Sequence, residues 1–269
     1  MTKYLQNYFN TYKESPPTTL DFYKLGKLIG KGAFGKVLLG IQKLTGLQVA
    51  IKTIDKEAIR KSEHNKRKVF QEIYILKKIR HPNIVRILEV FESSKHVLIV
   101  TEYCGGGDLL HFVKNKGRLT EAEAKIIFKQ IIYGARVCHL NGILHRDFKL
   151  DNILIDTEYS TAKVCDFGVS KLVKKGEVIY DQCGTPAYLA PEIAADTGYE
   201  GYSVDVWSMG VLLYAMLCGT VPFKAPTMKE LHKLILRGKY SVPNHVSPEA
   251  RNLMAGMINL VPANRLTIK

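Results

Sequence analysis

The sequence predicts an α+β protein with a mainly β N-terminal lobe, which holds one key helix, and a mainly α C-terminal lobe. Three observations lead to this prediction. Short β-rich segments follow one another up to about residue 100, three consecutive glycines then interrupt the chain at Gly105–Gly107, and the pattern beyond them is helical. The 269 residues are enough to build a hydrophobic core in such a molecule.

The expected N-terminal lobe covers residues from about 20 to 102. Residues 1–19 contain Pro16-Pro17 and no sustained apolar period, so we expect a flexible extension there. One amphipathic helix is indicated where Val69, Ile73 and Leu76 recur at i, i+4 and i+7. β-rich runs predict strands at residues 27–29, 36–40, 48–52 and 96–103, with a turn at 43–46.

A hinge is expected at about residues 102–108, and the C-terminal lobe at about 109–269, so the whole domain covers 20–269. Thr120 and Glu123 have the spacing of a capping box, after which apolar residues occupy one helical face as far as Cys138. The apolar run Val206–Cys218 is too short to cross a bilayer and indicates a buried helix.

Composition narrows the classes of function. Lysine and arginine exceed aspartate and glutamate by 39 − 25 = +14, but the longest basic run is only Lys66–Lys68, and pairs such as Lys174–Lys175 are shorter still. No aromatic stacking pattern accompanies them, so we expect a solvated basic surface rather than a nucleic-acid site, with a specific polyanion partner as the alternative. Five scattered cysteines without CxxC spacing, and a start without a signal-peptide core, favour a reducing compartment. We expect the cytoplasm, with the nucleus as an alternative.

A glycine-rich run, Gly30–Gly35, has the spacing GxGxxG, which could open a dinucleotide-binding unit. Such a unit requires a following helix and an acidic residue about twenty positions on. Here Val37–Leu39 continues as strand, and the charged residue seventeen positions after Gly35 is Lys52. A lysine suits a phosphate tail, so the run is better interpreted as a flap over phosphates. Lys52 alone would be interpreted as a surface residue, but Glu72 on the predicted helix is a candidate counter-charge.

Polar residues are concentrated at His145–Asn152, between two apolar runs. Such an arrangement is costly unless it forms a site. Asp147 can accept a hydroxyl proton, Lys149 can neutralise a phosphate, and Asn152 can offer an oxygen to a hard cation. Fourteen residues later, Asp166 supplies a carboxylate that could share a Mg²⁺ ion with Asn152.

These motifs resemble, in order, the signature set of eukaryotic protein kinases. The resemblance extends from about Tyr23 to Arg265 and rests on Gly30-x-Gly32-x-x-Gly35-x-Val37, Val49–Lys52, His145–Asn152, Asp166–Gly168 and Ala190–Glu192. Lys149 and Gly184–Pro186 resemble the serine/threonine branch. Residues 102–109 and 217–223 are most similar to the calcium/calmodulin-dependent and AMP-activated group.

The resemblance implies the bilobal protein-kinase fold and transfer of the γ-phosphoryl group from ATP, with Mg²⁺, to serine or threonine hydroxyls of proteins. Lys52, held by Glu72, would bind the α- and β-phosphates, and Asn152 and Asp166 would bind Mg²⁺. Asp147 would orient the acceptor hydroxyl and take its proton, and Lys149 would stabilise the transferred phosphoryl group. The implied nucleotide site comprises Ile29, Gly30, Lys31, Gly32, Ala33, Phe34, Gly35, Lys36, Val37, Ala50, Lys52, Thr101, Glu102, Cys104, Asp108 and Leu154.

Substrate recognition is assigned to Asp108, Asp151 and Thr185 by the same resemblance. The two aspartates match acidic positions that contact an arginine three residues before the phosphorylated residue (P−3) in basic-directed kinases, so we expect substrates with basic motifs. The alternative is that these acids bind ribose or simply face solvent.

Three departures from the family pattern affect regulation. Asp181 occupies the usual place of a phosphorylatable threonine, and its expected basic partners are Lys68, Arg146 and Lys171; it could activate partially, or be a bystander. Phe148 replaces the usual leucine. Arg265, the expected ion-pair partner of Glu192, lies four residues from the end of the sequence. The helix that normally follows in the family is therefore expected to be missing. Regulation by a segment or subunit outside the chain is left open as an alternative.

The active kinase has two alternatives: a pseudokinase scaffold without chemistry, and a dinucleotide oxidoreductase or polyanion-binding module. Pseudokinases usually lack the lysine or one of the two aspartates at the positions of Lys52, Asp147 and Asp166, and all three are present here. The kinase hypothesis requires these three side chains to face one cleft.

Overall fold

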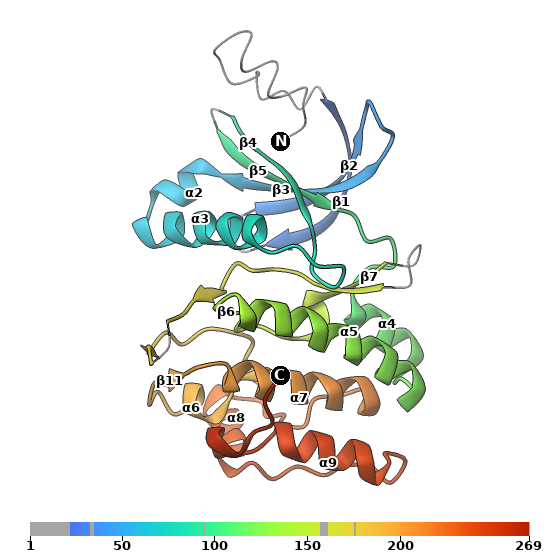
Figure 1. Cartoon of the computed structure of the whole chain (residues 1–269), viewed down its shortest axis with the longest axis vertical. Helices are drawn as coiled ribbons and strands as arrows, with labels where there is room; N and C mark the ends of the chain where they lie inside the picture. The colour runs from blue at the N-terminus through green and yellow to red at the C-terminus, as the bar shows by residue number, and fades with distance from the viewer. Residues whose placement is uncertain (1–21, 33–34, 94, 157–160, 175, 269) are drawn as a thin grey trace. The chain divides into compact units, whose positions relative to one another are not determined.

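The computed structural model describes residues 22–32, 35–93, 95–156, 161–174 and 176–268, so the predicted extension at 1–19 lies outside the described residues. The chain divides into two compact units (Figure 1). The N-terminal unit comprises Met1–Lys78 and Val85–Tyr103, and the C-terminal unit comprises Ile79–Ile84 and Cys104–Lys269.

The N-terminal unit is built on a five-stranded antiparallel sheet of order β1-β2-β3-β5-β4. Its strands are β1 (Tyr23–Gly32), β2 (Gly35–Gln42), β3 (Gln48–Asp55), β4 (Ile87–Glu92) and β5 (His96–Glu102). The predicted strands are therefore present. Two helices follow β3: the short α2 (Lys56–Arg60), which the sequence analysis did not predict, and α3 (Glu63–Lys78), which it did. Asp55 caps α2 by accepting the backbone N–H of Glu57 at 2.8 Å.

The two faces of this sheet carry different cores because successive strand residues point to opposite sides. One face buries Tyr23, Val49, Ile51, Leu98 and Val100 together. The opposite face buries Ile54 and Ile99 against Ile59 of α2 and Val69 and Ile73 of α3. Figure 1 shows α3 running beside the sheet. The apolar stripe that predicted α3 therefore packs the helix on the sheet face that carries Ile54 and Ile99.

The C-terminal unit is mainly helical and contains three two-stranded sheets, β6-β9, β7-β8 and β10-β11. Its helices are α4 (Leu109–Lys116), α5 (Glu121–Leu140), α6 (Pro191–Ala194), α7 (Ser203–Cys218), α8 (Met228–Arg237) and α9 (Pro248–Met257). Its strands are β6 (Ile143–Leu144), β7 (Ile153–Asp156), β8 (Thr161–Val164), β9 (Lys171–Leu172), β10 (Val178–Ile179) and β11 (Tyr199–Glu200). Both units together have the α+β composition that the sequence predicts.

Local sequence signals explain the main helices of this unit. The predicted capping box of α5 is present, because Thr120 accepts the Glu123 N–H while the Glu123 carboxylate accepts the Thr120 N–H at 2.9 Å. Helix α7 is predominantly apolar apart from Asp205 in its first turn, and its residues from Val204 to Leu217 are buried, as the apolar run predicts. It lies between α5 and α9 (Figure 1). Within the described residues, no helix combines the length and the apolar character that crossing a membrane requires.

A buried ion pair ties the end of the described chain to α6. The Arg265 guanidinium donates to both carboxylate oxygens of Glu192, at 2.6 and 2.7 Å, which confirms the pairing expected from the sequence. It also donates to the carbonyl oxygens of Asn259 and Ser203 and lies 5.1 Å from the ring centre of Trp207. The Arg265 side chain is fully buried, and these partners together offset the cost of removing its charge from water.

Candidate functional site

Lys52 and Glu72 form an ion pair inside the N-terminal unit, with 2.6 Å between Lys52 Nζ and Glu72 Oε1. Lys52 lies on β3, two residues before Ile54, so its side chain points to the face that α3 covers. Glu72 lies on α3 beside Ile73 and is 4% exposed. The carboxylate therefore holds the lysine extended along the sheet, as the sequence suggested, rather than leaving it on the surface.

The sheet register places several predicted nucleotide-binding residues on the same face as Lys52. Val37 is the cross-strand partner of Lys52, and Ala50, two residues before Lys52, is the partner of Thr101. Because paired residues in a sheet point to the same side, all four side chains share one face. Val37, Ala50 and Thr101 are half-buried. This face thus offers an apolar surface next to an anchored cation.

The described glycines of the glycine-rich run lie at the end of β1 and the start of β2, where Gly30 pairs with Val37 and Gly32 with Gly35. A side chain at Gly35 would require the backbone to shift, because its Cβ would lie 1.6 Å from the carbonyl oxygen of Thr53 on β3. A Cβ at Gly30 would instead lie 3.6 Å from Val37, which is ordinary contact. Of the other predicted residues, Ile29, Lys31 and Lys36 are exposed, whereas Ala33 and Phe34 lie outside the described residues.

In the C-terminal unit, Asp147 is at the centre of a hydrogen-bonded cluster. Its Oδ1 accepts the Thr185 hydroxyl at 2.7 Å, and its Oδ2 accepts Asn152 Nδ2 at 2.8 Å and lies 3.0 Å from Lys149 Nζ. Lys149 Nζ also donates to the Thr185 hydroxyl at 2.8 Å. Burial by itself raises the pKa of Asp147, but the bonds from Thr185 and Lys149 outweigh it, and the pKa lies below its ordinary value. Asp147 is therefore an ionised acceptor at neutral pH.

Asn152 and Asp166, the predicted metal ligands, are brought together by the ends of β7 and β8. Cys165, which precedes Asp166, donates its N–H to the carbonyl oxygen of Asn152 at 2.9 Å. The Asn152 amide nitrogen donates to Asp147, which leaves its Oδ1 to serve as an acceptor. Asp166 is exposed and has a positive φ of 59°. One amide oxygen and one carboxylate fit Mg²⁺, which commonly completes its shell with water and phosphate oxygens.

Asp205 is a positioning residue that the sequence analysis missed. This fully buried carboxylate on α7 accepts the backbone N–H groups of His145 at 3.0 Å and Arg146 at 2.8 Å, and it bonds His139 Nε2 at 2.9 Å. Complete burial alone would raise the pKa of Asp205, but His139 and His145 together lower it. An acidic residue at the start of the apolar run Val206–Cys218 was the available signal, because a charge is costly there unless it is paired.

Comparison with known proteins identifies the family. The family model for the protein kinase domain matches residues 23–269. The chain belongs to the protein kinase family. The rice serine/threonine protein kinase OSK3 is 43% identical over 250 residues, which are 93% of this chain and 49% of the relative. The rice CBL-interacting protein kinase 16 is 41% identical over 252 residues, covering 93% of this chain and 55% of the relative. A serine/threonine-protein kinase SIK3 homolog of Danio rerio is 37% identical over 254 residues, covering 94% and 21%.

These relatives confirm the family predicted from the sequence and agree with the closer assignment to the calcium/calmodulin-dependent and AMP-activated group. The chain spans about half the length of the rice kinases that it matches. The roles of individual residues in this kinase rest on the geometry described here and stay predictions.

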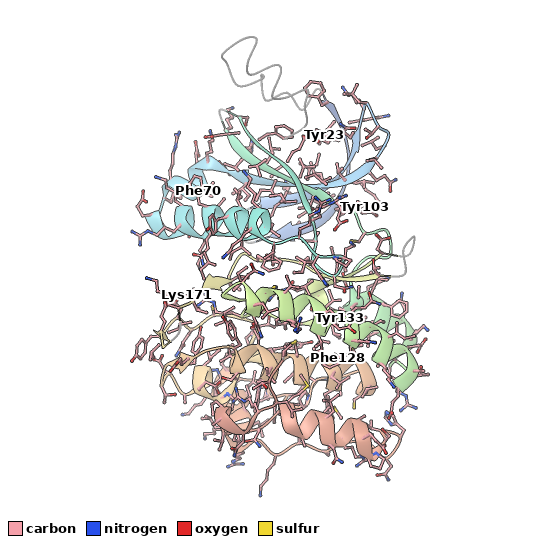
Figure 2. All side chains as sticks on the ribbon, viewed as in Figure 1. Tyr23, Phe70, Tyr103, Phe128, Tyr133 and Lys171 are labelled. Carbon is pink, nitrogen blue, oxygen red and sulfur yellow. The ribbon has the colours of Figure 1, made fainter. Side chains whose placement is uncertain are left out.

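Asp181 of the kinase contacts two of its three expected basic partners. Its Oδ2 lies 3.1 Å from Arg146 Nη1 and 3.7 Å from the ammonium of Lys171, which projects from β9 (Figure 2). Partial burial by itself raises the pKa of Asp181, but Arg146 and Lys171 lower it overall, so the side chain carries its charge at neutral pH. Lys68 lies on α3 in the N-terminal unit, and its pairing with Asp181 stays a prediction.

The predicted hinge residues are fixed partly by β7. Gly106 donates its N–H to the carbonyl oxygen of Ile155 at 2.9 Å, and Ile155 donates to Gly107 at 2.8 Å. Asp108 forms an isolated bridge with Leu154, and its Oδ1 caps α4 by accepting the His111 N–H at 2.7 Å. Of the remaining predicted residues, Cys104 is buried, Asp151 is exposed, and Glu102 accepts the Arg86 N–H through its carboxylate at 2.8 Å.

Proposed function

We propose that this kinase domain transfers the γ-phosphoryl group of ATP, with Mg²⁺, to serine and threonine hydroxyls of proteins. The observation that carries the proposal is the cluster around Asp147, in which the side chains of Thr185, Asn152 and Lys149 contact its ionised carboxylate. Thr185 and Asn152 hold the carboxylate in place by neutral hydrogen bonds, and Lys149 adds a positive charge beside it. The names of the serine/threonine kinase relatives support the same reaction.

In the proposed reaction Asp147 accepts a hydrogen bond from the acceptor hydroxyl and thereby points its oxygen at the terminal phosphorus. Because the pKa of Asp147 is lowered, it is a weak base, and its main contribution is orientation rather than full deprotonation. Lys149, 3.0 Å from Asp147, is placed to neutralise charge on the transferred phosphoryl group. Lys52 would contact the nucleotide phosphates, with Glu72 holding its extended conformation.

The proposed metal ligands are Asn152 and Asp166. When bound, Mg²⁺ would neutralise phosphate charge and polarise the group that is transferred. The Asn152 amide also donates to Asp147, so the same side chain would keep the orienting carboxylate and the metal-binding oxygen in a fixed relation.

For substrates, we propose a preference for arginine at P−3, recognised by Asp108 and Asp151. One oxygen of Asp108 caps α4, which leaves the other to meet a guanidinium, and Asp151 is exposed. Asp181 would support activity without phosphorylation at that position, through Arg146 and Lys171. We further propose a cytoplasmic or nuclear location and a regulatory segment or subunit outside this chain. One relative is itself named as interacting with CBL.

The test is phosphate transfer from ATP to a serine peptide with arginine at P−3, measured with and without Mg²⁺ and repeated with Lys52→Met and Asp166→Asn. We expect transfer by the wild type of order 1–100 s⁻¹ and a loss of at least about 100-fold in each variant. A peptide with alanine at P−3 should be a poorer substrate. Nucleotide binding without any transfer by the wild type would refute the proposed activity and indicate a pseudokinase.

A further inference from the structure

Arg146 links three separate segments of the C-terminal unit through its guanidinium. Nε donates to the carbonyl oxygen of Val169 at 2.6 Å, and Nη1 donates to Asp181 at 3.1 Å and to the Tyr199 hydroxyl at 3.3 Å. Its side chain is only 7% exposed, and its φ of 69° lies in the left-handed region that a non-glycine residue rarely adopts. The residue next to Asp147 is therefore held by contacts made far along the chain.

Tyr199 makes two bonds through one hydroxyl. The oxygen accepts from Arg146, and the O–H donates to the backbone carbonyl of Asp181 at 3.2 Å. Its strand β11 also pairs with β10, where Tyr199 faces Ile179. Burial raises the pKa of Tyr199 to about 12, so the hydroxyl remains a donor throughout the usual assay range. Nothing in the sequence pattern singled out this residue.

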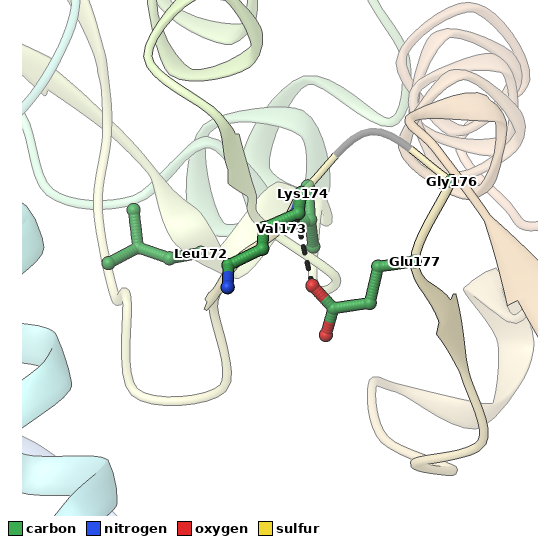
Figure 3. A pocket seen from close by; sticks show the side chains of 5 residues that line it. All are labelled: Leu172, Val173, Lys174, Gly176 and Glu177. Carbon is green, nitrogen blue, oxygen red and sulfur yellow. Dashed lines mark hydrogen bonds between the residues drawn. The ribbon is translucent and has the colours of Figure 1, made fainter.

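The two attachments of Asp181 differ in their sensitivity to solvent. Its side chain is 58% exposed, so salt screens the ion pair with Arg146. Lys171 is shared, since it also lies 3.3 Å from Glu177, whose carboxylate accepts the Lys174 N–H at 3.0 Å (Figure 3). The bond from Tyr199 is neutral and comes from a residue that is 4% exposed. It binds the main chain, so it does not depend on which side chain is at position 181.

We infer that Tyr199 is a positioning residue of this kinase, whose hydroxyl holds the segment Val178–Cys183 to Arg146 and thereby fixes Arg146 beside Asp147. This inference rests on the proposed phosphoryl transfer for its effect on rate, and on the hydrogen bonds alone for its effect on the segment. It assigns the segment two independent links to Arg146, one ionic through Asp181 and one neutral through Tyr199, in addition to the backbone pairing of β10 with β11.

The first test compares Tyr199→Phe with Tyr214→Phe in peptide phosphorylation. Tyr214 is the matched control, because its hydroxyl also donates to a backbone carbonyl, that of Ser241 at 2.9 Å, but has no contact with Arg146. Tyr199→Phe loses one buried and one partly buried hydrogen bond, so we expect kcat to fall about fivefold to tenfold, with the peptide KM within about twofold of wild type. Tyr214→Phe should keep kcat within about twofold. A kcat unchanged in Tyr199→Phe, or lowered equally in both variants, would overturn the inference.

Salt separates the two attachments. When NaCl is raised from about 0.05 to about 0.5 M at saturating peptide, kcat of Tyr199→Phe should fall about threefold further than that of wild type, because the segment is then linked to Arg146 through the screened ion pair alone. In Asp181→Asn, which keeps the Tyr199 bond, kcat should depend on the NaCl concentration no more steeply than in wild type. Identical salt profiles for Tyr199→Phe and wild type contradict the proposal.

Hydrogen exchange gives a readout that does not require activity. Backbone amides at residues 179–182 should exchange about tenfold faster in Tyr199→Phe than in wild type, and at the wild-type rate in Tyr214→Phe. A wild-type chain that transfers no phosphate would refute the proposed function. Unchanged exchange at 179–182 in Tyr199→Phe would refute this inference whether or not the chain is active.

Discussion

Glu192→Gln tests the energetic importance of the buried ion pair with Arg265. The substitution keeps the shape of the side chain but removes its charge, and the Arg265 guanidinium, fully buried, is left without a counter-ion. Two charge-assisted bonds of 2.6 and 2.7 Å reduce to at most one, while the bonds to Asn259 and Ser203 remain. Removing one member of a buried pair costs about 3–5 kcal/mol. With a denaturant dependence of about 2 kcal/mol per molar urea, the unfolding midpoint should fall by about 2 M.

The assay is urea unfolding followed by tryptophan fluorescence. Trp207 is the only tryptophan of the chain, it is fully buried, and its ring centre lies 5.1 Å from the Arg265 guanidinium carbon. The signal therefore reports the surroundings of the ion pair. Glu249→Gln is the matched control, because this glutamate is exposed at the start of α9, and its midpoint should move by less than about 0.5 M. A Glu192→Gln midpoint that moves no further than the control would refute the reasoning.

Three further predictions concern the site. Glu72→Gln should lower kcat about 10- to 100-fold, because Lys52 loses the carboxylate that holds it extended; steady-state kinetics checks this, and an unchanged kcat would show that Lys52 needs no anchor. Asp147 has a lowered pKa, so its stabilising contribution is complete above the ordinary value of 3.8 and is lost as pH falls through the lowered one. Asp147→Asn should accordingly lose stability less steeply than wild type below about pH 4 in acid unfolding, and parallel curves would disprove this. Asp181→Asn should lower kcat only about twofold to fivefold at low salt, because the Asp181 member of the ion pair is exposed to solvent; no change would make Asp181 a bystander.

Much of the site could be predicted because its chemistry uses charged and polar side chains, which cost free energy to bury. A polar run such as His145–Asn152 between two apolar segments is visible in the sequence because the burial of charge is costly. Lys52 on its own indicates a surface residue, and only the other motifs assign it to the site. The capping box at Thr120 is local, so its two hydrogen bonds follow from spacing alone. The Arg265 pair with Glu192 joins residues far apart in sequence, and it was expected only through resemblance to a family.

Other parts could not be predicted, for identifiable physical reasons. Tyr199 lies 53 residues beyond Arg146, and a tyrosine beside a glycine gives no indication that its hydroxyl will join two other segments. Helix α2 has five residues, too few for an apolar period to be recognised. Strand β4 is mostly half-buried, so its apolar pattern is weak. The missed features depend on contacts that form only in the folded chain.

Two glycines of the glycine-rich run, Gly30 on β1 and Gly35 on β2, offer different opportunities for engineering. Position 35 tolerates no substitution without forcing β2 away from β3, so a variant there would report on the folding of the sheet and not on nucleotide handling. Position 30 has space for a methyl group and a φ that any residue can adopt. Gly30→Ala is therefore the substitution that can ask whether a ligand must approach the backbone closely, with the strand pairing left intact.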